Sequence, residues 1–139
     1  MIELITKYLE WGSLFDDLPL MIISKPLVKR FFEIMSEIEI KDYAENLTLP
    51  IIIEGLGFSD EVGITNTLNA FDIYLEINRF KFDHSELNGI HHYKIGHEIG
   101  DKFGIYLAHL ICKLVNIHDY ALVQIKNIES YLEFKIVPK

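Results

Sequence analysis

Residues 97–116 have the sequence HEIGDKFGIYLAHLICKLVN, and this stretch decides the fold class. Its apolar residues recur at the spacing of an amphipathic helix. These apolar positions are Ile99, Phe103, Tyr106, Leu107, Leu110, Ile111 and Leu114. We therefore predict one long helix over residues 97–116, with its apolar side turned towards a core.

Strand patterns are present before this helix. Apolar and polar residues alternate over residues 71–82, which is typical of a half-buried strand. A polar segment at 83–89 predicts a turn, after which residues 90–95 can pair back as the second strand of a hairpin.

Two further strands are predicted after the helix, over residues 121–126 and 131–137, joined by a turn at 127–130. The order of elements in the second half is therefore β-β-α-β-β. Because a single helix lies between two hairpins, we expect an antiparallel sheet with the long helix packed on one face. The predicted fold class is α+β.

The first half is predicted to be mainly helical. Residues 2–11 have apolar side chains at helical spacing and end at Gly12. Ser24 is a predicted N-cap with Pro26 in the first turn, and an amphipathic pattern then continues to Ile38.

The segment over residues 40–58 fits two interpretations. A helical period continues past residue 43, but Pro50 precedes three isoleucines whose propensity is for strand. Residues 50–54 could therefore be helix or a short buried strand. A short helix is predicted to begin at Ser59 and to end at Leu68.

The length and composition predict a single domain over residues 1–139, mainly helical over 1–70 and built of sheet plus long helix over 71–139. No apolar run approaches the ~18 residues that a membrane span needs. The single cysteine, Cys112, cannot form an internal disulfide, and no secretory leader is visible. We therefore expect a cytoplasmic protein.

The net charge is −8, and it is concentrated in the first half. Residues 1–70 carry 12 acidic and 5 basic side chains, and the basic residues elsewhere are scattered. Because an acidic surface repels phosphate backbones, the charge argues against nucleic-acid binding and disfavours a DNA-binding regulator.

Small residues recur every four positions through the predicted long helix, at Gly96, Gly100, Gly104, Ala108 and Cys112. Such a ridge allows close approach of another backbone, which could be the sheet, an N-terminal helix or a helix of a second subunit. On this ridge the thiol of Cys112 is expected to be buried and inert.

The N-terminal region is unusually apolar for a chain end, with Trp11 and Phe15 as its most prominent members. It is either folded onto the core or a docking surface. The candidate interface residues are thus Trp11, Phe15, Gly96, Gly100, Gly104 and Ala108.

All six histidines lie in the second half, at His84, His91, His92, His97, His109 and His118. On the predicted helix His97 and Asp101 lie one turn apart and could ligate a metal ion such as zinc. Residues 97–101 resemble the zincin motif, with aspartate in place of its second histidine. No third ligand stands at a fixed spacing, and surface or capping histidines are the alternative.

Residues 90–137 resemble a segment of short, mostly uncharacterised archaeal proteins, some of which are regarded as regulators. The resemblance rests on His97, Gly100, Lys102, Phe103 and Leu107 in one helix, followed by a strand pair. It implies an archaeal regulatory or accessory protein and no established activity.

The sequence contains no catalytic constellation, so we assign no catalytic residue, and an enzyme stays a third alternative for which no residue can be named. We predict a non-enzymatic protein-interaction or oligomerisation module, acting as a homo-oligomer or as an accessory or regulatory subunit. The alternatives are a histidine-rich metal or small-ligand sensor and, against the charge, a DNA-binding regulator. No cofactor is predicted apart from the candidate zinc ion.

Overall fold

The computed structural model describes residues 24–50 and 63–139. Its helices are α2 (Lys25–Ile34), α3 (Glu37–Asp42), the π-helix η1 (Tyr43–Thr48), α5 (Gly63–Ile77) and α6 (Asp101–Asn116), and its strands are β1 (Lys81–Leu87), β2 (Ile90–Gly96), β3 (Tyr120–Ile128) and β4 (Tyr131–Pro138). The expected helix over residues 2–11, the question of helix or strand at 51–54 and the predicted helix start at Ser59 lie outside the described residues.

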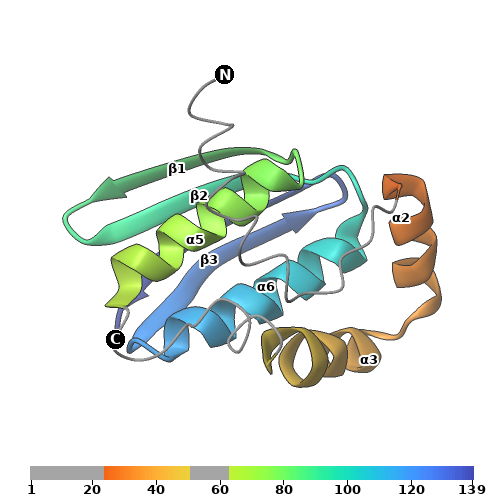
Figure 1. Ribbon diagram of the computed structural model, residues 1–139, viewed down its shortest axis with the longest axis horizontal. Helices are drawn as coiled ribbons and strands as arrows, with labels where there is room; N and C mark the ends of the chain where they lie inside the picture. The colour runs from red at the N-terminus through yellow and green to blue at the C-terminus, as the bar shows by residue number, and fades with distance from the viewer. Residues whose placement is uncertain (1–23, 51–62) are drawn as a thin grey trace, which may run out of the picture.

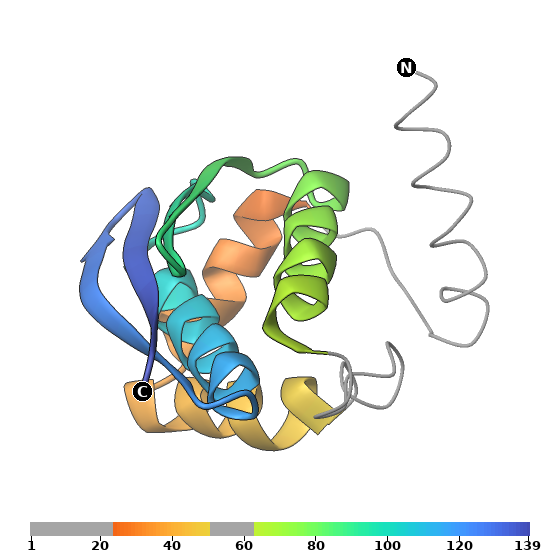
Figure 2. The same cartoon turned by 90° about the vertical axis from the view of Figure 1, so that its left-hand side faces the viewer.

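The four strands form one antiparallel sheet in the order β1-β2-β4-β3. Helix α6 connects the two hairpins and packs on one face of the sheet, and α2, α3, α5 and η1 gather on that same side (Figures 1 and 2). The predicted α+β class and the β-β-α-β-β order are therefore confirmed. No helix in the described ranges is long and apolar enough to cross a membrane.

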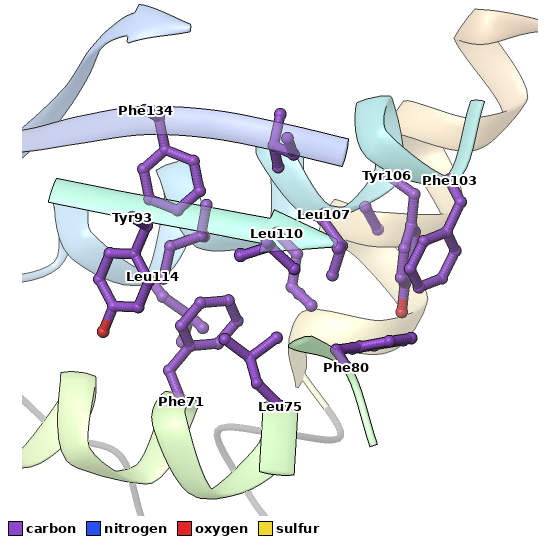
Figure 3. Close-up of a cluster of buried hydrophobic side chains, with 14 of the residues drawn as sticks. Phe71, Leu75, Phe80, Tyr93, Phe103, Tyr106, Leu107, Leu110, Leu114 and Phe134 are labelled. Atoms are coloured by element: carbon purple, nitrogen blue, oxygen red, sulfur yellow. The ribbon is translucent and has the colours of Figure 1, made fainter. Parts of the chain in front are cut away.

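Alternate side chains of the central strands β2 and β4 point into the core. Tyr93 on β2 stands opposite Phe134 on β4, and their rings stack at 5.3 Å between centroids. Figure 3 shows Tyr93 and Phe134 within this core. Next to them Ile95 stands opposite Leu132, and all four side chains are fully buried. The residues between them, such as Lys94, turn to the other face, which no described helix covers.

The first hairpin differs from its prediction. The strand predicted over residues 71–82 is wrong, because residues 63–77 form α5 and β1 begins only at Lys81. Leu68, Phe71 and Leu75 are buried at helical spacing, so the same apolar residues fit both periods and packing against the sheet selects the helix.

The polar turn predicted at 83–89 is also wrong for most of its length, since residues 83–87 belong to β1. The chain reverses at Asn88 and Gly89 alone, which have φ values of 52° and 78°. An Asn-Gly pair with two positive φ values is the preferred two-residue turn of a hairpin, because its twist matches that of the strands.

Helix α6 begins four residues later than predicted. Its N-cap is Gly100, whose φ of 117° is a conformation that glycine adopts readily and other residues rarely do. Residues 97–99 therefore form a loop between β2 and α6. The Glu98 N–H in this loop donates to the carbonyl of Ser130, which lies between β3 and β4.

The predicted N-cap at Ser24 is confirmed, but the helix that follows ends at Ile34. Ser36 starts a new helix with a capping box, in which its hydroxyl accepts from the Glu39 N–H and the Glu39 carboxylate accepts from the Ser36 N–H. The break between α2 and α3 is closed by Lys102 of α6, whose ammonium donates to the carbonyls of Glu33 and Met35.

Candidate functional site

Large apolar side chains remain exposed on three consecutive elements, α2, α3 and η1. We call them the helical apolar surface, and its members are Leu27, Phe31, Ile34, Ile38, Tyr43 and Leu47. Ile34 and Ile38 are 81% and 83% exposed. Single exposed apolar residues are ordinary, but a run of them on adjacent helices is typical of an interaction site.

A groove of about 680 Å³ lies between α2, α5 and α6 and opens onto this surface, because Phe31, Ile34 and Tyr43 belong to both. Aromatic rings form much of its wall: the centroid of Phe32 lies 5.3 Å from that of Phe103 and 5.2 Å from that of Tyr106. Figure 3 shows Phe103, Tyr106 and Phe80 gathered at one end of the core. The groove is therefore continuous with the aromatic part of the core.

Few polar groups line the groove. The Tyr106 hydroxyl donates to Thr48 Oγ1 at 3.1 Å, and burial raises the pKa of Tyr106 well above its ordinary value. Burial also raises the pKa of Tyr74 to about 12. Lys25 contributes the groove's single cation among the described residues, and its Nζ lies 5.4 Å from the centroid of Phe80.

A second cluster joins α5 to the first hairpin, and we call it the histidine–aspartate network. Asp72 of α5 accepts from the Tyr93 hydroxyl at 2.5 Å and lies 2.8 Å from His84 Nδ1. His84 Nε2 lies 2.9 Å from His91 Nδ1, and the ring of His84 stacks on Tyr93 at 4.1 Å. Four side chains from three elements thus form one hydrogen-bonded chain.

The network holds one hydrogen between its two imidazoles. Because an ionised Asp72 can only accept, His84 Nδ1 carries a hydrogen in this arrangement. The hydrogen between the rings then comes from His91, whose Nδ1–H donates to His84 Nε2. Protonating both rings would place two N–H groups face to face.

The electrostatics of the network oppose a charge on His91. Burial lowers the pKa of His91 first, and the neighbouring His84 lowers it further, while Glu86 and Asp72 act in the opposite direction. Burial also raises the pKa of Tyr93 far above its ordinary value, and its bond to Asp72 adds to this shift. The network therefore stabilises the fold most strongly when His91 is neutral.

Changing Asp72 to Asn should lower the free energy of unfolding by about 1–3 kcal/mol, because the amide cannot accept two charge-assisted hydrogen bonds. Urea unfolding at neutral pH measures this. The matched control is Asp83→Asn on the exposed side of β1, which should change stability by less than about 0.5 kcal/mol. Equal midpoints for the two variants would show that the network contributes nothing to stability.

The structure does not bring the two predicted metal ligands together on one helix. Asp101 is the exposed first residue of α6, whereas His97 lies in the preceding loop and is fully buried. The premise of one helical turn between them is wrong, because Gly100 starts the helix only after His97. Within residues 24–50 and 63–139, no group of three metal-ligating side chains is present.

The small-residue ridge is also interrupted. Gly96 belongs to β2 and Gly100 is the N-cap, so α6 carries only Gly104, Ala108 and Cys112. The thiol of Cys112 is exposed, which corrects the expectation that it is buried.

The remaining ridge packs within this chain. A Cβ at Gly104 would lie within 2.8 Å of Asn127 Cγ on β3, so the sheet, rather than a second subunit, approaches α6 at this position. Ala108 packs against the core, half-buried. The other two candidate interface residues, Trp11 and Phe15, lie outside the described residues.

The sequence analysis predicted neither the helical apolar surface nor the histidine–aspartate network. The helical apolar surface could have been recognised, because α2 carries apolar residues in adjacent pairs, such as Phe31 and Phe32, and one helix face cannot bury both members. The network gave no such signal, since Asp72 was assigned to a strand and His84 to a turn.

Nothing matches the chain in comparisons with protein-family models, curated proteins and solved structures. The resemblance to short archaeal proteins stays a prediction.

Proposed function

We propose that this chain is a non-enzymatic interaction module that pairs with a second copy of itself through the helical apolar surface. The observation that carries the proposal is the exposure of six large apolar side chains on α2, α3 and η1. Burying such a surface against an apolar partner is the main favourable term in association. In α2, Leu27, Phe31 and Ile34 are spaced to share one side of the helix.

The charges around this surface favour a second copy as the partner. Helix α2 carries three basic residues and one acidic residue, whereas α3 and η1 together carry four acidic residues and one basic residue. Glu45 of η1 already pairs with His109 and Lys113 of α6, so the acidic charges available to a partner lie on α3. In a two-fold interface each surface patch meets its counterpart on the other copy, so α2 of one copy can lie against α3 and η1 of its partner. This arrangement pairs opposite charges at the rim in spite of the negative net charge.

The other expected roles have less support. The described residues offer no metal site, and the net charge of −8 opposes binding to phosphate backbones. The exposed single thiol of Cys112 agrees with a reducing compartment such as the cytoplasm.

A charge-swap experiment tests both the surface and the identity of the partner. One variant carries Lys29→Glu with Arg30→Glu, and the other carries Glu37→Lys with Asp42→Lys. Each alone places like charges across the rim and should associate at least about tenfold more weakly than the parent. An equimolar mixture should recover association, because opposite charges then face each other.

Analytical ultracentrifugation of each variant and of the mixture measures this outcome. Failure of the mixture to associate more tightly than either variant would contradict the proposed arrangement. If each variant alone associates as tightly as the parent, the interface lies elsewhere.

A further inference from the structure

The groove between α2, α5 and α6 has the properties of a site for a small amphipathic molecule. Its volume of about 680 Å³ lies in the middle of the ~300–1,000 Å³ range of ligand sites. Its wall is mostly apolar and aromatic, and only a few polar groups interrupt it. Sites of this composition bind a ligand by its apolar body and orient it by one or two polar contacts.

The groove is elongated along α2. Residues from Lys25 to Met35 line it, which at ~1.5 Å rise per residue corresponds to about 15 Å. Met35 and the rings of Phe31 and Phe32 supply adaptable and flat apolar surfaces along this length. An extended hydrocarbon chain fits these dimensions better than a compact polar metabolite.

One charged group marks one end of the groove. The ammonium of Lys25 lies over the ring of Phe80, and no carboxylate of the described residues pairs with it. The charge of Lys25 also acts on His97. The pKa of His97 is lowered to about 4, mainly by burial and to a smaller extent by Lys25. Asn78 also lines the groove and can add a hydrogen bond. A cation beside an apolar wall, with no carboxylate partner among residues 24–50 and 63–139, is complementary to an anionic head group.

We propose that this groove binds a long-chain carboxylate, with its hydrocarbon chain along α2 and its carboxylate on Lys25. The proposal goes beyond self-association and does not rest on it, and the two share Phe31, Ile34 and Tyr43 at the mouth of the groove. It requires one ligand per chain, a preference for the ionised head group and an affinity that rises with chain length.

Titration calorimetry with dodecanoate, below its micelle concentration, tests the proposal on the full chain. We expect one molecule bound per chain and at least about tenfold tighter binding than for dodecanol, which lacks the charge. Decanoate should bind roughly fifteenfold more weakly than dodecanoate, because it lacks two methylenes and each contributes about fourfold.

Variants of two lysines on α2 separate a specific head-group site from general attraction to a positive helix. Lys25→Met should remove the preference for dodecanoate over dodecanol, and Lys25→Arg should retain most of it. The matched control is Lys29→Met, since Lys29 lines a different hollow at the start of α6. It should leave the preference unchanged.

Three results would overturn the proposal. The first is that the full chain does not bind dodecanoate, whether the groove stays empty or is filled by the chain itself. The second is an unchanged head-group preference in Lys25→Met, and the third is an equal loss of preference in the Lys25 and Lys29 variants. The solution mass without ligand is an independent readout. A dimer that binds no dodecanoate contradicts this inference alone, and a monomer that binds it contradicts the proposed self-association alone.

Discussion

Changing Gly104 to Ala should destabilise the protein by about 1–3 kcal/mol, although alanine is the better helix former. The reason is the contact between α6 and β3: an added Cβ would overlap with Asn127 Oδ1. Asn127 cannot simply turn away, because its Nδ2 donates to the carbonyl of Asp101 in the first turn of α6. Urea unfolding of the parent and of the variant measures the difference.

A double-mutant cycle makes this prediction specific to Asn127. In an Asn127→Ala background the space beside Gly104 is empty, so Gly104→Ala should stabilise by up to about 1 kcal/mol. The sign of the alanine substitution should therefore reverse between the two backgrounds. A stabilising Gly104→Ala in the parent would show that α6 and β3 are not packed as described.

Lowering the pH from 7 to 4 should remove up to about 3 kcal/mol of stability through His97 alone. His97 is fully buried, and burial together with Lys25 lowers its pKa to about 4. The unfolded chain takes up this proton near the ordinary value of 6.5, whereas the folded chain does not. A depressed pKa thus gives stability that is present above pH 6.5 and lost as the pH falls towards 4.

His97→Asn isolates this contribution from those of the other acidic and histidine residues. The Ile99 N–H donates to His97 Nδ1 at 3.0 Å, and an asparagine oxygen can accept the same bond without titrating. The variant is expected to be less stable at pH 7 but to lose less stability between pH 6.5 and 4. Parallel curves for the two proteins over that range, from urea unfolding at several pH values, would contradict the assignment.

The central strands β2 and β4 could be predicted because their patterns are local and unambiguous. Alternating residues around Tyr93 and Phe134 match only a half-buried strand. The two-residue turn at Asn88-Gly89 was hidden within the longer polar turn expected at 83–89. Residues 71–77 could not be assigned in this way. Their apolar side chains fit a strand and a helix equally, and only contact with the finished sheet decides between them.

The histidine–aspartate network depended on that ambiguous segment. Asp72 meets His84 and Tyr93 only because α5 is a helix lying on the first hairpin, so an error of secondary structure hid the network. Gly100 illustrates a different limit. A glycine at helical spacing looks like part of a helix face, and only its φ of 117° shows that it ends the preceding loop.

The solution mass of the full chain tests the proposed self-association most directly, when it is measured together with a double variant of the helical apolar surface. Ile34 and Ile38 are mostly exposed, so Ile34→Asp with Ile38→Asp should leave the fold of a single copy intact. By sedimentation equilibrium at micromolar concentration, we predict twice the chain mass of 16.2 kDa for the parent and 16.2 kDa for the variant. A parent mass of 16.2 kDa at every concentration, or a variant that remains a dimer, would contradict the proposed function.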